Sequence, residues 1–376
     1  MKLAILTQPL HNNYGGLLQA FALQKVLKKE LNINSETLDI RNSTTPFSKF
    51  KGTVKKGVDK YLFGKKIAPA FIPTAAQKMA IAKNTDAFKN KYIRISSKKY
   101  IKQNLTDLEN LNFDGYLVGS DQVWRPRYSP NIQTYFLNFL KNNSAAKRVS
   151  YAASFGVDFN EFNNSDVKEC AKLLKKFDAV SVREEGAVTL CEESFGVKAN
   201  LVLDPTLLLD VEDYKAFFDK DLETKKQIMF YVLDPDYANN EIEESVKEFF
   251  NLPLFKIMPH PINEENIKNI ENCVYPPVED WLEGFLSSEF IITDSFHGTI
   301  FSILFNKQFI TIGNVDRGMA RFNSVLKIFN LENHLVSDLA GIRKVLNEKI
   351  DYTSVNKILA DEKSKSIDFL KSALLK

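Results

Sequence analysis

Short apolar runs alternate with amphipathic stretches through the first half of the chain, at lengths typical of strands and helices. The run Leu3–Thr7 predicts a strand, and the 3.6-residue periodicity of Gly16–Leu31 predicts a helix. Further strands are predicted at Glu36–Ile40, Tyr116–Val118, Arg148–Ala152 and Ala179–Val182, and further helices at Asp166–Lys175 and Glu184–Ser194. Strands that alternate with helices in this way indicate a parallel, doubly wound sheet.

The same alternation starts again after Leu203–Thr206, which is the predicted boundary between two domains. At 376 residues the chain is longer than one hydrophobic core normally supports. The second half predicts strands at Gln227–Leu233, Leu254–Ile257, Phe290–Thr293 and Phe309–Ile312, and helices at Asn240–Phe250, Val278–Leu286, Thr299–Phe305 and Val355–Leu374. We therefore expect an α/β fold with two doubly wound, Rossmann-like domains, residues 1–203 and 204–376, that face each other across a cleft. The last helix is a candidate to pack back on the first domain.

The small net charge of +3 conceals a strongly basic segment. Residues 41–102 hold sixteen Lys and Arg against two Asp, a net charge of +14, so the other residues sum to −11. Aromatic residues lie among these cations, and this composition suits an anionic surface such as phospholipid, a pyrophosphate-linked substrate or nucleic acid. A solvated pair of basic helices without a partner explains it equally well. The segment is predicted to be helical with loops, and since it carries no nucleic-acid motif, a membrane is the preferred partner.

The cysteines and apolar runs bear on location and on metal binding. The chain has three scattered cysteines without a CxxC pair and only four histidines, so we expect reduced thiols and no structural zinc. No run of about 18 apolar residues could span a membrane, and Met1-Lys2 leads directly into a strand rather than a signal peptide. The expectation is a cytoplasmic protein, with any membrane contact peripheral and at the inner face.

Two polar turns follow predicted strands in the first half. His11–Gly16 opens the first helix, where backbone N–H groups and glycines let an anionic ligand approach, but it lacks the GxGxxG spacing of a dinucleotide site. Gly119–Trp124 displays a carboxylate, an amide and an indole, which together suit a sugar. The structural alternatives are a plain loop for the first turn and, for the second, Asp121 as a helix cap with Trp124 in the core.

Three arginines are candidates for binding an anionic substrate. Arg183 follows a predicted buried strand, where a guanidinium suits a bidentate grip on carboxylate or phosphate. An ion pair with Glu184, Glu185 or another acid is the structural alternative. Arg317 and Arg321 follow a strand of the second half, and either reach the same pocket or are solvated loop residues.

The turn Asp294–Gly298 lies between an apolar strand and an apolar helix, a place where α/β enzymes carry their chemistry. His297 is a candidate general acid, with Asp294 and Ser295 available to orient it or to bind ligand. A serine hydrolase is disfavoured because no GxSxG motif is present. The structural alternative is a capping turn with a hydrogen-bonded core histidine.

Five segments, taken in order, point to one family. They are TQPLHNNYGGLLQAFALQKVL, GYLVGSDQVW, SVRE, LDPTLLL and ITDSFHGTIFSILFNKQFI with the arginine-containing stretch behind it, and they extend to about residue 326. Together they resemble the polysaccharide pyruvyl transferase family, while residues 41–102 and the C-terminal tail carry no recognisable motif. The resemblance implies a GT-B-like fold and transfer of the pyruvyl group of phosphoenolpyruvate to a sugar as a ketal across two hydroxyls.

The resemblance also implies roles for the candidate residues. The phosphoenolpyruvate site would consist of Arg183, Ser295, His297, Gly298, Arg317 and Arg321, and the acceptor site of Asn12, Tyr14, Gly15, Asp121 and Trp124. His297 would protonate the methylene carbon of phosphoenolpyruvate, Arg183 would bind the anion, and Asp121 is the candidate base. The arginines would neutralise the phosphate, so no metal and no cofactor besides the co-substrate are expected.

The acceptor implied by the resemblance is a sugar, and a lipid-linked oligosaccharide would give the basic segment a purpose. The product would enter a bacterial capsule, exopolysaccharide or cell-wall polymer. The alternatives are a GT-B glycosyltransferase that uses a nucleotide sugar, and a sugar-binding or scaffold protein without catalysis. Binding of a nucleotide sugar without phosphate release from phosphoenolpyruvate would favour the first of these.

Overall fold

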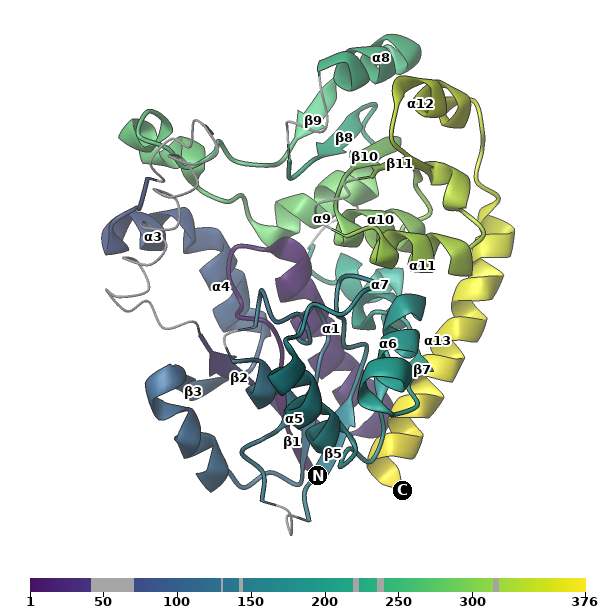
Figure 1. Ribbon diagram of the computed structural model, residues 1–376. Coiled ribbons are helices and arrows are strands. Elements are labelled where there is room, and N and C mark those ends of the chain that lie inside the picture. Colours follow the sequence, from purple (N-terminus) through teal and green to yellow (C-terminus); the bar gives the residue numbers. More distant parts are fainter. Residues whose placement is uncertain (42–70, 130, 142–144, 219–222, 235–239, 314–317) are drawn as a thin grey trace, which may run out of the picture.

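The computed structural model describes residues 1–41, 71–129, 131–141, 145–218, 223–234, 240–313 and 318–376. These residues form two five-stranded parallel sheets, one in each half of the chain, with helices packed around them (Figure 1). The predicted α/β class with doubly wound parallel sheets is confirmed. We call the part built on the first sheet the N-lobe and the part built on the second sheet the C-lobe.

The N-lobe sheet has the strand order β3-β2-β1-β4-β5. Its strands are β1 (Lys2–Leu6), β2 (Asn34–Ile40), β3 (Ile95–Tyr100), β4 (Gly115–Val118) and β5 (Lys147–Ser150). In the central strand, Ile5 lies opposite Thr37 of β2 and Leu117 of β4. A short parallel pair, β6 (Ser181–Val182) and β7 (Asn200–Leu201), continues beyond β5 through isolated bridges.

The C-lobe sheet has the order β12-β11-β10-β8-β9. Its strands are β8 (Ile228–Tyr231), β9 (Leu254–Lys256), β10 (Phe290–Thr293), β11 (Gln308–Ile312) and β12 (Leu335–Val336). The central strand β10 is entirely buried, and its Thr293 lies opposite Tyr231 and Thr311. A strand buried on both faces needs apolar residues at every position, which explains the unbroken run in the sequence.

Helices and short 3₁₀ turns connect these strands. The helices are α1 (Tyr14–Leu31), α3 (Ala75–Ile81), α4 (Lys83–Tyr92), α5 (Asn164–Leu174), α6 (Glu185–Phe195), α7 (Val211–Lys215), α8 (Asn240–Phe250), α9 (Val278–Ser287), α10 (Phe296–Leu304), α11 (Ala320–Ile328), α12 (Leu339–Leu346) and α13 (Tyr352–Leu375). The 3₁₀ turns are η1 (Lys102–Asn110), η2 (Ile132–Phe136), η3 (Pro205–Leu208), η4 (Asn266–Cys273) and η6 (Glu332–His334). None of the helices in the described ranges is both long and apolar enough to cross a bilayer.

Side chains of β1 alternate between two hydrophobic cores. Leu3 and Ile5 pack on the side of α1, whereas Ala4 and Leu6 pack in a separate core on the opposite face. The core on the α1 side continues into the C-lobe, where it includes Trp281 of α9. The two sheets are therefore joined by shared apolar packing rather than by a linker alone.

The strand β3 is absent from the sequence-based prediction, which expected helices and loops over the basic segment. Lys98 and Lys99 interrupt the apolar pattern, and both are exposed on this edge strand. Charged side chains are usual on edge strands because they discourage pairing with another chain. Residues 71–102 thus supply α3, α4 and β3 to the N-lobe, and residues 42–70 of the basic segment lie outside the described ranges.

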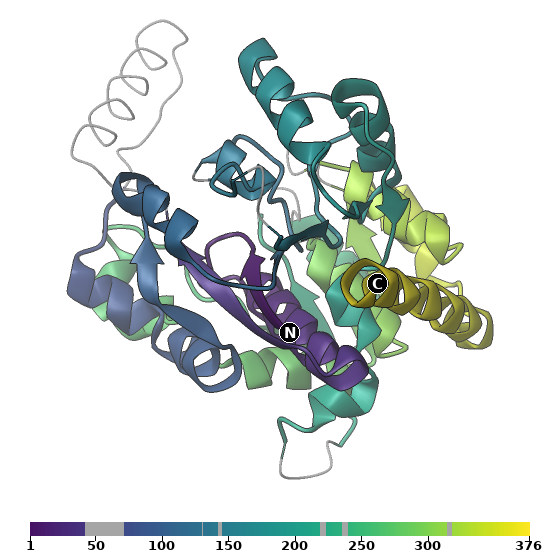
Figure 2. The ribbon, with the colours of Figure 1, turned by 90° about the horizontal axis from the view of Figure 1, so that it is seen from below.

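The last helix, α13, leaves the C-lobe and packs along the N-lobe (Figure 1). The hydroxyl of Ser366 accepts a hydrogen bond of 3.0 Å from the Leu203 amide, and the Phe369 ring lies 6.4 Å from the ring of Tyr151. Seen from below, the amino and carboxyl ends of the chain lie at the same end of the molecule (Figure 2). Because α13 contacts the N-lobe after the C-lobe is complete, it ties the two lobes together.

We expect Leu370→Ala to lower the free energy of unfolding by about 2–5 kcal/mol, because it leaves a cavity in the shared core. Leu370 is fully buried, whereas Leu375 on the same helix is 58% exposed and provides the matched control. Urea unfolding followed by circular dichroism would measure both variants. Equal, small losses for Leu370→Ala and Leu375→Ala would show that α13 contributes little to joining the lobes.

Candidate active site

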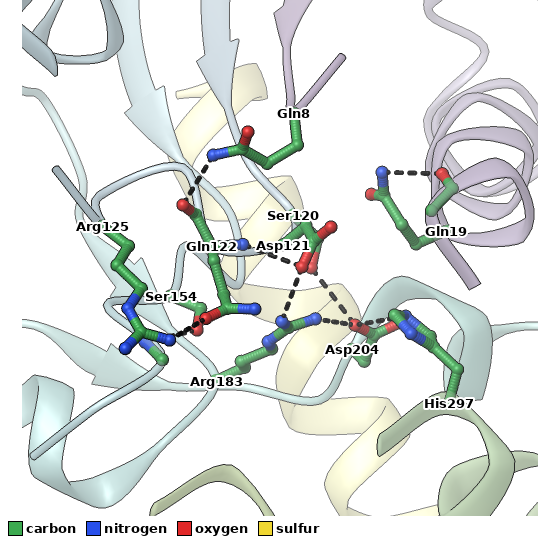
Figure 3. Close-up of polar contacts among 12 residues, drawn as sticks. Gln8, Gln19, Ser120, Asp121, Gln122, Arg125, Ser154, Arg183, Asp204 and His297 are labelled. Carbon is green, nitrogen blue, oxygen red and sulfur yellow. Dashed lines mark hydrogen bonds and ion pairs between the residues drawn. The ribbon is translucent and has the colours of Figure 1, made fainter. Parts of the chain in front are cut away.

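Arg183 is the centre of a buried charge network at the carboxyl ends of the N-lobe strands (Figure 3). It directly follows β6 and is 3% exposed. Its Nη1 donates to Asp204 Oδ2 at 2.7 Å and its Nη2 donates to Asp121 Oδ1 at 3.0 Å. Arg183 therefore forms the ion pairs that were the structural alternative to anion binding. Both terminal nitrogens of its guanidinium donate to carboxylates.

Asp204 is a member of this network that was not predicted as a site residue. One carboxylate oxygen caps η3, because Oδ1 accepts from the amide and hydroxyl of Thr206 at 3.1 and 2.8 Å. The other oxygen, Oδ2, accepts from Arg183 and from the Ser120 hydroxyl, and lies 3.8 Å from His297 Nε2. Burial raises the pKa of Asp204, but His297 and Arg183 outweigh burial and hold the pKa below its usual value.

His297 comes from the C-lobe, at the second position of α10, and points at the Asp204 carboxylate (Figure 3). The N-terminus of α1 packs directly on its ring: a Cβ atom placed on Gly15 would lie 2.1 Å from His297 Nδ1. Only a residue without a side chain lets α1 approach the imidazole this closely. Gly15 therefore belongs at the site, where it makes room for the histidine.

The protonation state of His297 follows from its burial. With 6% of its surface exposed, burial lowers its pKa to about 4; Asp204 opposes this effect and Arg183 adds to it. The ring is therefore neutral at pH 7 in the structure as it stands. Its Nε2 has no hydrogen-bond partner among the described residues.

The other residues of the turn Asp294–Gly298 stabilise its conformation. Ser295 is the N-cap of α10, and its Oγ accepts from the Gly298 amide at 3.3 Å. A Cβ on Gly298 would lie 2.2 Å from Thr293 Oγ1, so glycine allows α10 to pack against β10. Asp294 accepts from the amides of Leu233 and Asp234 at 2.7 and 2.9 Å. These contacts fix the position of His297 through the backbone.

Asp121 follows β4 and has a positive φ of 76°. Its Oδ1 accepts from Arg183 and, at 2.8 Å, from the Gln122 amide. Burial raises the pKa of Asp121, but Arg183 and His297 outweigh burial and lower the pKa overall. A carboxylate held in its ionised form is a weak proton acceptor, which limits Asp121 as a general base.

Two predicted acceptor residues, Trp124 and Tyr14, are buried in the hydrophobic core. Trp124 is fully buried, stacks on Phe136 at 5.2 Å, and donates its indole N–H to the Tyr135 carbonyl at 3.0 Å. Tyr14 is 1% exposed and its hydroxyl donates to the carbonyl of Pro276 at 2.9 Å. In this structure the polar groups of both side chains are therefore paired inside the core.

Two further candidates lie at the margin of the network. Asn12 is half-buried and its Oδ1 accepts from the Thr85 hydroxyl at 2.8 Å. Arg321 of α11 is 7% exposed and places its guanidinium over the Phe296 ring, 5.4 Å from the centroid, while Arg183 lies 4.6 Å from the same centroid. Burial, with Arg183 next, lowers the pKa of Arg321 to about 10. Arg317 lies outside the described residues.

Glu184 is a second site carboxylate that was not predicted as such, since it was considered only as an ion-pair partner. It is fully buried, and its Oε1 accepts from the Ser154 hydroxyl and from the amides of Phe155 and Gly156. Its Oε2 lies 3.9 Å from Arg183 Nε. Burial raises the pKa of Glu184 above its usual value.

Within the described ranges, no group of His, Cys, Asp and Glu has an arrangement that could hold a metal ion.

A solved structure shows the same overall fold. MnaA from S. aureus, in complex with UDP, has a TM-score of 0.51 at 13% sequence identity, with 98% of this chain and 96% of that chain covered. The UDP-GlcNAc 2-epimerase from Neisseria meningitidis bound to UDP-GlcNAc covers 100% of both chains at 13% identity, with a TM-score of 0.49. At this identity the similarity to the S. aureus protein shows the fold alone, and it confirms the predicted GT-B-like arrangement.

Sequence comparison identifies the family. No curated protein matches the chain. The profile of the family described as polysaccharide pyruvyl transferase matches residues 13–317, which include α1, Asp121, Arg183, Asp204 and His297. This match covers most of the chain and agrees with the five ordered segments, so the protein belongs to the polysaccharide pyruvyl transferase family.

Proposed function

We propose that the protein transfers the pyruvyl group of phosphoenolpyruvate to two hydroxyls of a sugar, forms a cyclic ketal and releases phosphate. The observation that carries the proposal is the buried network in which His297 of the C-lobe meets Arg183 and Asp204 of the N-lobe. The acceptor would be a saccharide, preferably a lipid-linked one, of a capsule, exopolysaccharide or cell-wall polymer. No metal or further cofactor has a role in this chemistry.

Cations near His297 support an anionic donor substrate. The guanidinium groups of Arg183 and Arg321 both lie over the Phe296 ring. Arg183 Nε has no hydrogen-bond partner among the described residues, so this nitrogen can still donate to a carboxylate or phosphate oxygen. Because these residues are almost completely buried, the lobes must separate locally for the substrate to reach them.

The proposed reaction has three steps. His297 donates a proton to the methylene carbon of phosphoenolpyruvate, and C2 becomes electrophilic. A sugar hydroxyl oxygen attacks C2 and loses its proton to a base. Because C2 is already electrophilic, a weak base suffices, and Asp121 is the candidate. Phosphate then leaves from C2, and the second hydroxyl adds to C2 and loses its proton to the released phosphate, which completes the ketal. Asp204 would hold the His297 ring and stabilise its protonated form.

Phosphate release from phosphoenolpyruvate in the presence of saccharide acceptors tests this function. We expect His297→Gln to lower the rate by about 100-fold or more, as for loss of a general acid. His334→Gln is a matched control, because His334 is also buried but binds the Phe309 carbonyl away from the site. Binding of a nucleotide sugar, with no phosphate release for any acceptor, would favour a glycosyltransferase instead. Normal turnover by His297→Gln would exclude this histidine as the acid.

The lowered pKa of His297 predicts proton uptake when phosphoenolpyruvate binds. Free His297 is neutral above a pH of about 4, and a bound anion favours the protonated ring. Because the complex holds more protons than the free protein, affinity should rise as the pH falls from 7 towards 4. Titration calorimetry in two buffers of different ionisation enthalpy should show roughly one proton fewer taken up by His297→Gln than by wild type. Equal uptake by both proteins would contradict the proposed protonation.

Membrane contact is proposed as a second property, supported by the surface of α3 and of the segment that leads into it. Ile72 and Met79 are 61% and 67% exposed, and Ala75 and Ala76 are exposed between them. The helix contains Lys78 and no acidic residue. Apolar side chains beside cations suit the interface of an anionic bilayer.

We expect sedimentation with phosphatidylcholine vesicles that contain phosphatidylglycerol, weakened by salt, and none with phosphatidylcholine alone. Ile72→Asp with Met79→Asp should reduce this binding. Phe159→Asp provides a control, because Phe159 is 59% exposed but lies outside α3 and the segment before it. Equal binding to neutral and anionic vesicles, or no effect of the double substitution, would contradict the role of α3.

A further inference from the structure

Polar atoms without a hydrogen-bond partner gather where the two lobes meet. Arg183 Nε, Glu184 Oε2, His297 Nε2 and Gln19 Oε1 are buried and have no partner among the described residues. Leaving a buried donor or acceptor unpaired destabilises a folded protein. Arg183 Nε and Glu184 Oε2 lie 3.9 Å apart and partly compensate each other. An unpaired buried atom that hydrogen bonds link to the network, such as Gln19 Oε1, is a candidate contact for a bound ligand.

The amide of Gln19 has one possible orientation. Gln19 lies on α1, is fully buried, and its Nε2 donates to Thr7 Oγ1 at 2.9 Å and to the Gly16 carbonyl at 3.0 Å. A carbonyl oxygen can only accept, so the nitrogen must face Gly16 and the oxygen must occupy the other position. The unpaired Oε1 is therefore fixed by the fold.

A chain of hydrogen bonds connects this amide to the charge network. Thr7, which accepts from Gln19, donates through Oγ1 to the Ser120 carbonyl at 2.8 Å, and the Ser120 hydroxyl donates to Asp204 Oδ2 at 3.2 Å. Gln19 also lies one turn after Gly15, on the side of α1 that meets His297. Figure 3 draws Gln19 in the same close-up as Ser120, Asp121 and His297, with its amide bonded to its own helix.

A second glutamine on the same helix shows what a purely structural amide does. Gln24 Nε2 also donates to a threonine hydroxyl, Thr37 Oγ1 at 2.9 Å, and to a carbonyl, that of Arg94 at 2.8 Å. Its Oε1, however, accepts from the Arg94 amide at 2.9 Å. The two side chains thus make matching donor contacts and differ in whether the oxygen is used.

The chemistry of the missing partner distinguishes the two substrates. Ionised phosphoenolpyruvate offers only acceptor oxygens, which can satisfy Arg183 Nε but not the oxygen of Gln19. A sugar hydroxyl can donate. We propose that Gln19 Oε1 accepts a hydrogen bond from one hydroxyl of the sugar acceptor and thereby selects sugars that carry this hydroxyl. The inference rests on the proposed function and names a specificity-determining residue for it.

The test combines side-chain and hydroxyl deletions. Phosphate release would be measured with methyl hexosides, disaccharides and their monodeoxy analogues, for wild type, Gln19→Met and Gln19→Glu. For one hydroxyl position, we expect deletion to lower kcat/KM of the wild type about tenfold, and to have no further effect in Gln19→Met. Gln19→Glu, which keeps an acceptor oxygen, should still discriminate. The dissociation constant of phosphoenolpyruvate, measured by calorimetry, should stay within about twofold in all variants.

Gln24→Met is the matched control, because it removes a comparable amide from α1 away from the site and should leave acceptor kinetics unchanged. Thermal unfolding would confirm that each variant is folded. If Gln19→Met does not fold, the comparison of wild type with Gln19→Glu still tests the proposal. Equal discrimination at every hydroxyl in wild type and Gln19→Met would overturn the assignment, and would leave a bound water as the partner of Oε1. Absence of phosphate release by the wild type with this panel and with lipid-linked saccharides would instead overturn the proposed function, and the assignment with it.

Discussion

The paired ion contacts of Arg183 are the interaction on which the site depends. A guanidinium with 3% exposure must be neutralised inside the protein, and here Asp121 from the end of β4 and Asp204 from the start of η3 do so. The same Asp204 oxygen lies within 3.8 Å of His297 from the other lobe. Removing any one charge would leave its partners buried and uncompensated, so chemistry and cohesion between the lobes rest on the same few atoms.

Much of the fold follows from local patterns. The strand Phe290–Thr293 is apolar throughout because it is buried on both faces, and the sequence places it correctly. The strand Ile95–Tyr100 is an edge strand with exposed lysines. These lysines interrupt the alternation of apolar and polar residues by which a strand is recognised in a sequence. The burial of Trp124 in the core is the alternative that the sequence already offers. Tyr14 is different, because it bonds to Pro276, which comes from the other half of the chain. No local signal reveals such a partner.

Asp204 shows why site residues can be hidden in a sequence. Asp-Pro-Thr is a common start for a short helix, and one oxygen of Asp204 does serve that purpose. The second oxygen faces Arg183 and His297 and takes part in the charge network. The sequence contains the segment, but a single carboxylate with two structural roles becomes visible only when both lobes are in place.

The contact between Gly15 and His297 links the protonation of the ring to the separation of the lobes. The backbone of α1 covers the imidazole so closely that no side chain fits between them, and burial holds the pKa of His297 near 4. When the lobes part and water reaches the ring, its pKa should return towards the ordinary value of about 6.5. Protonation therefore favours the open form, and between these two pH values acidification and opening are coupled. Because the same contact buries the ring and joins the lobes, a separation of the lobes that admits substrate would also expose the histidine to protonation.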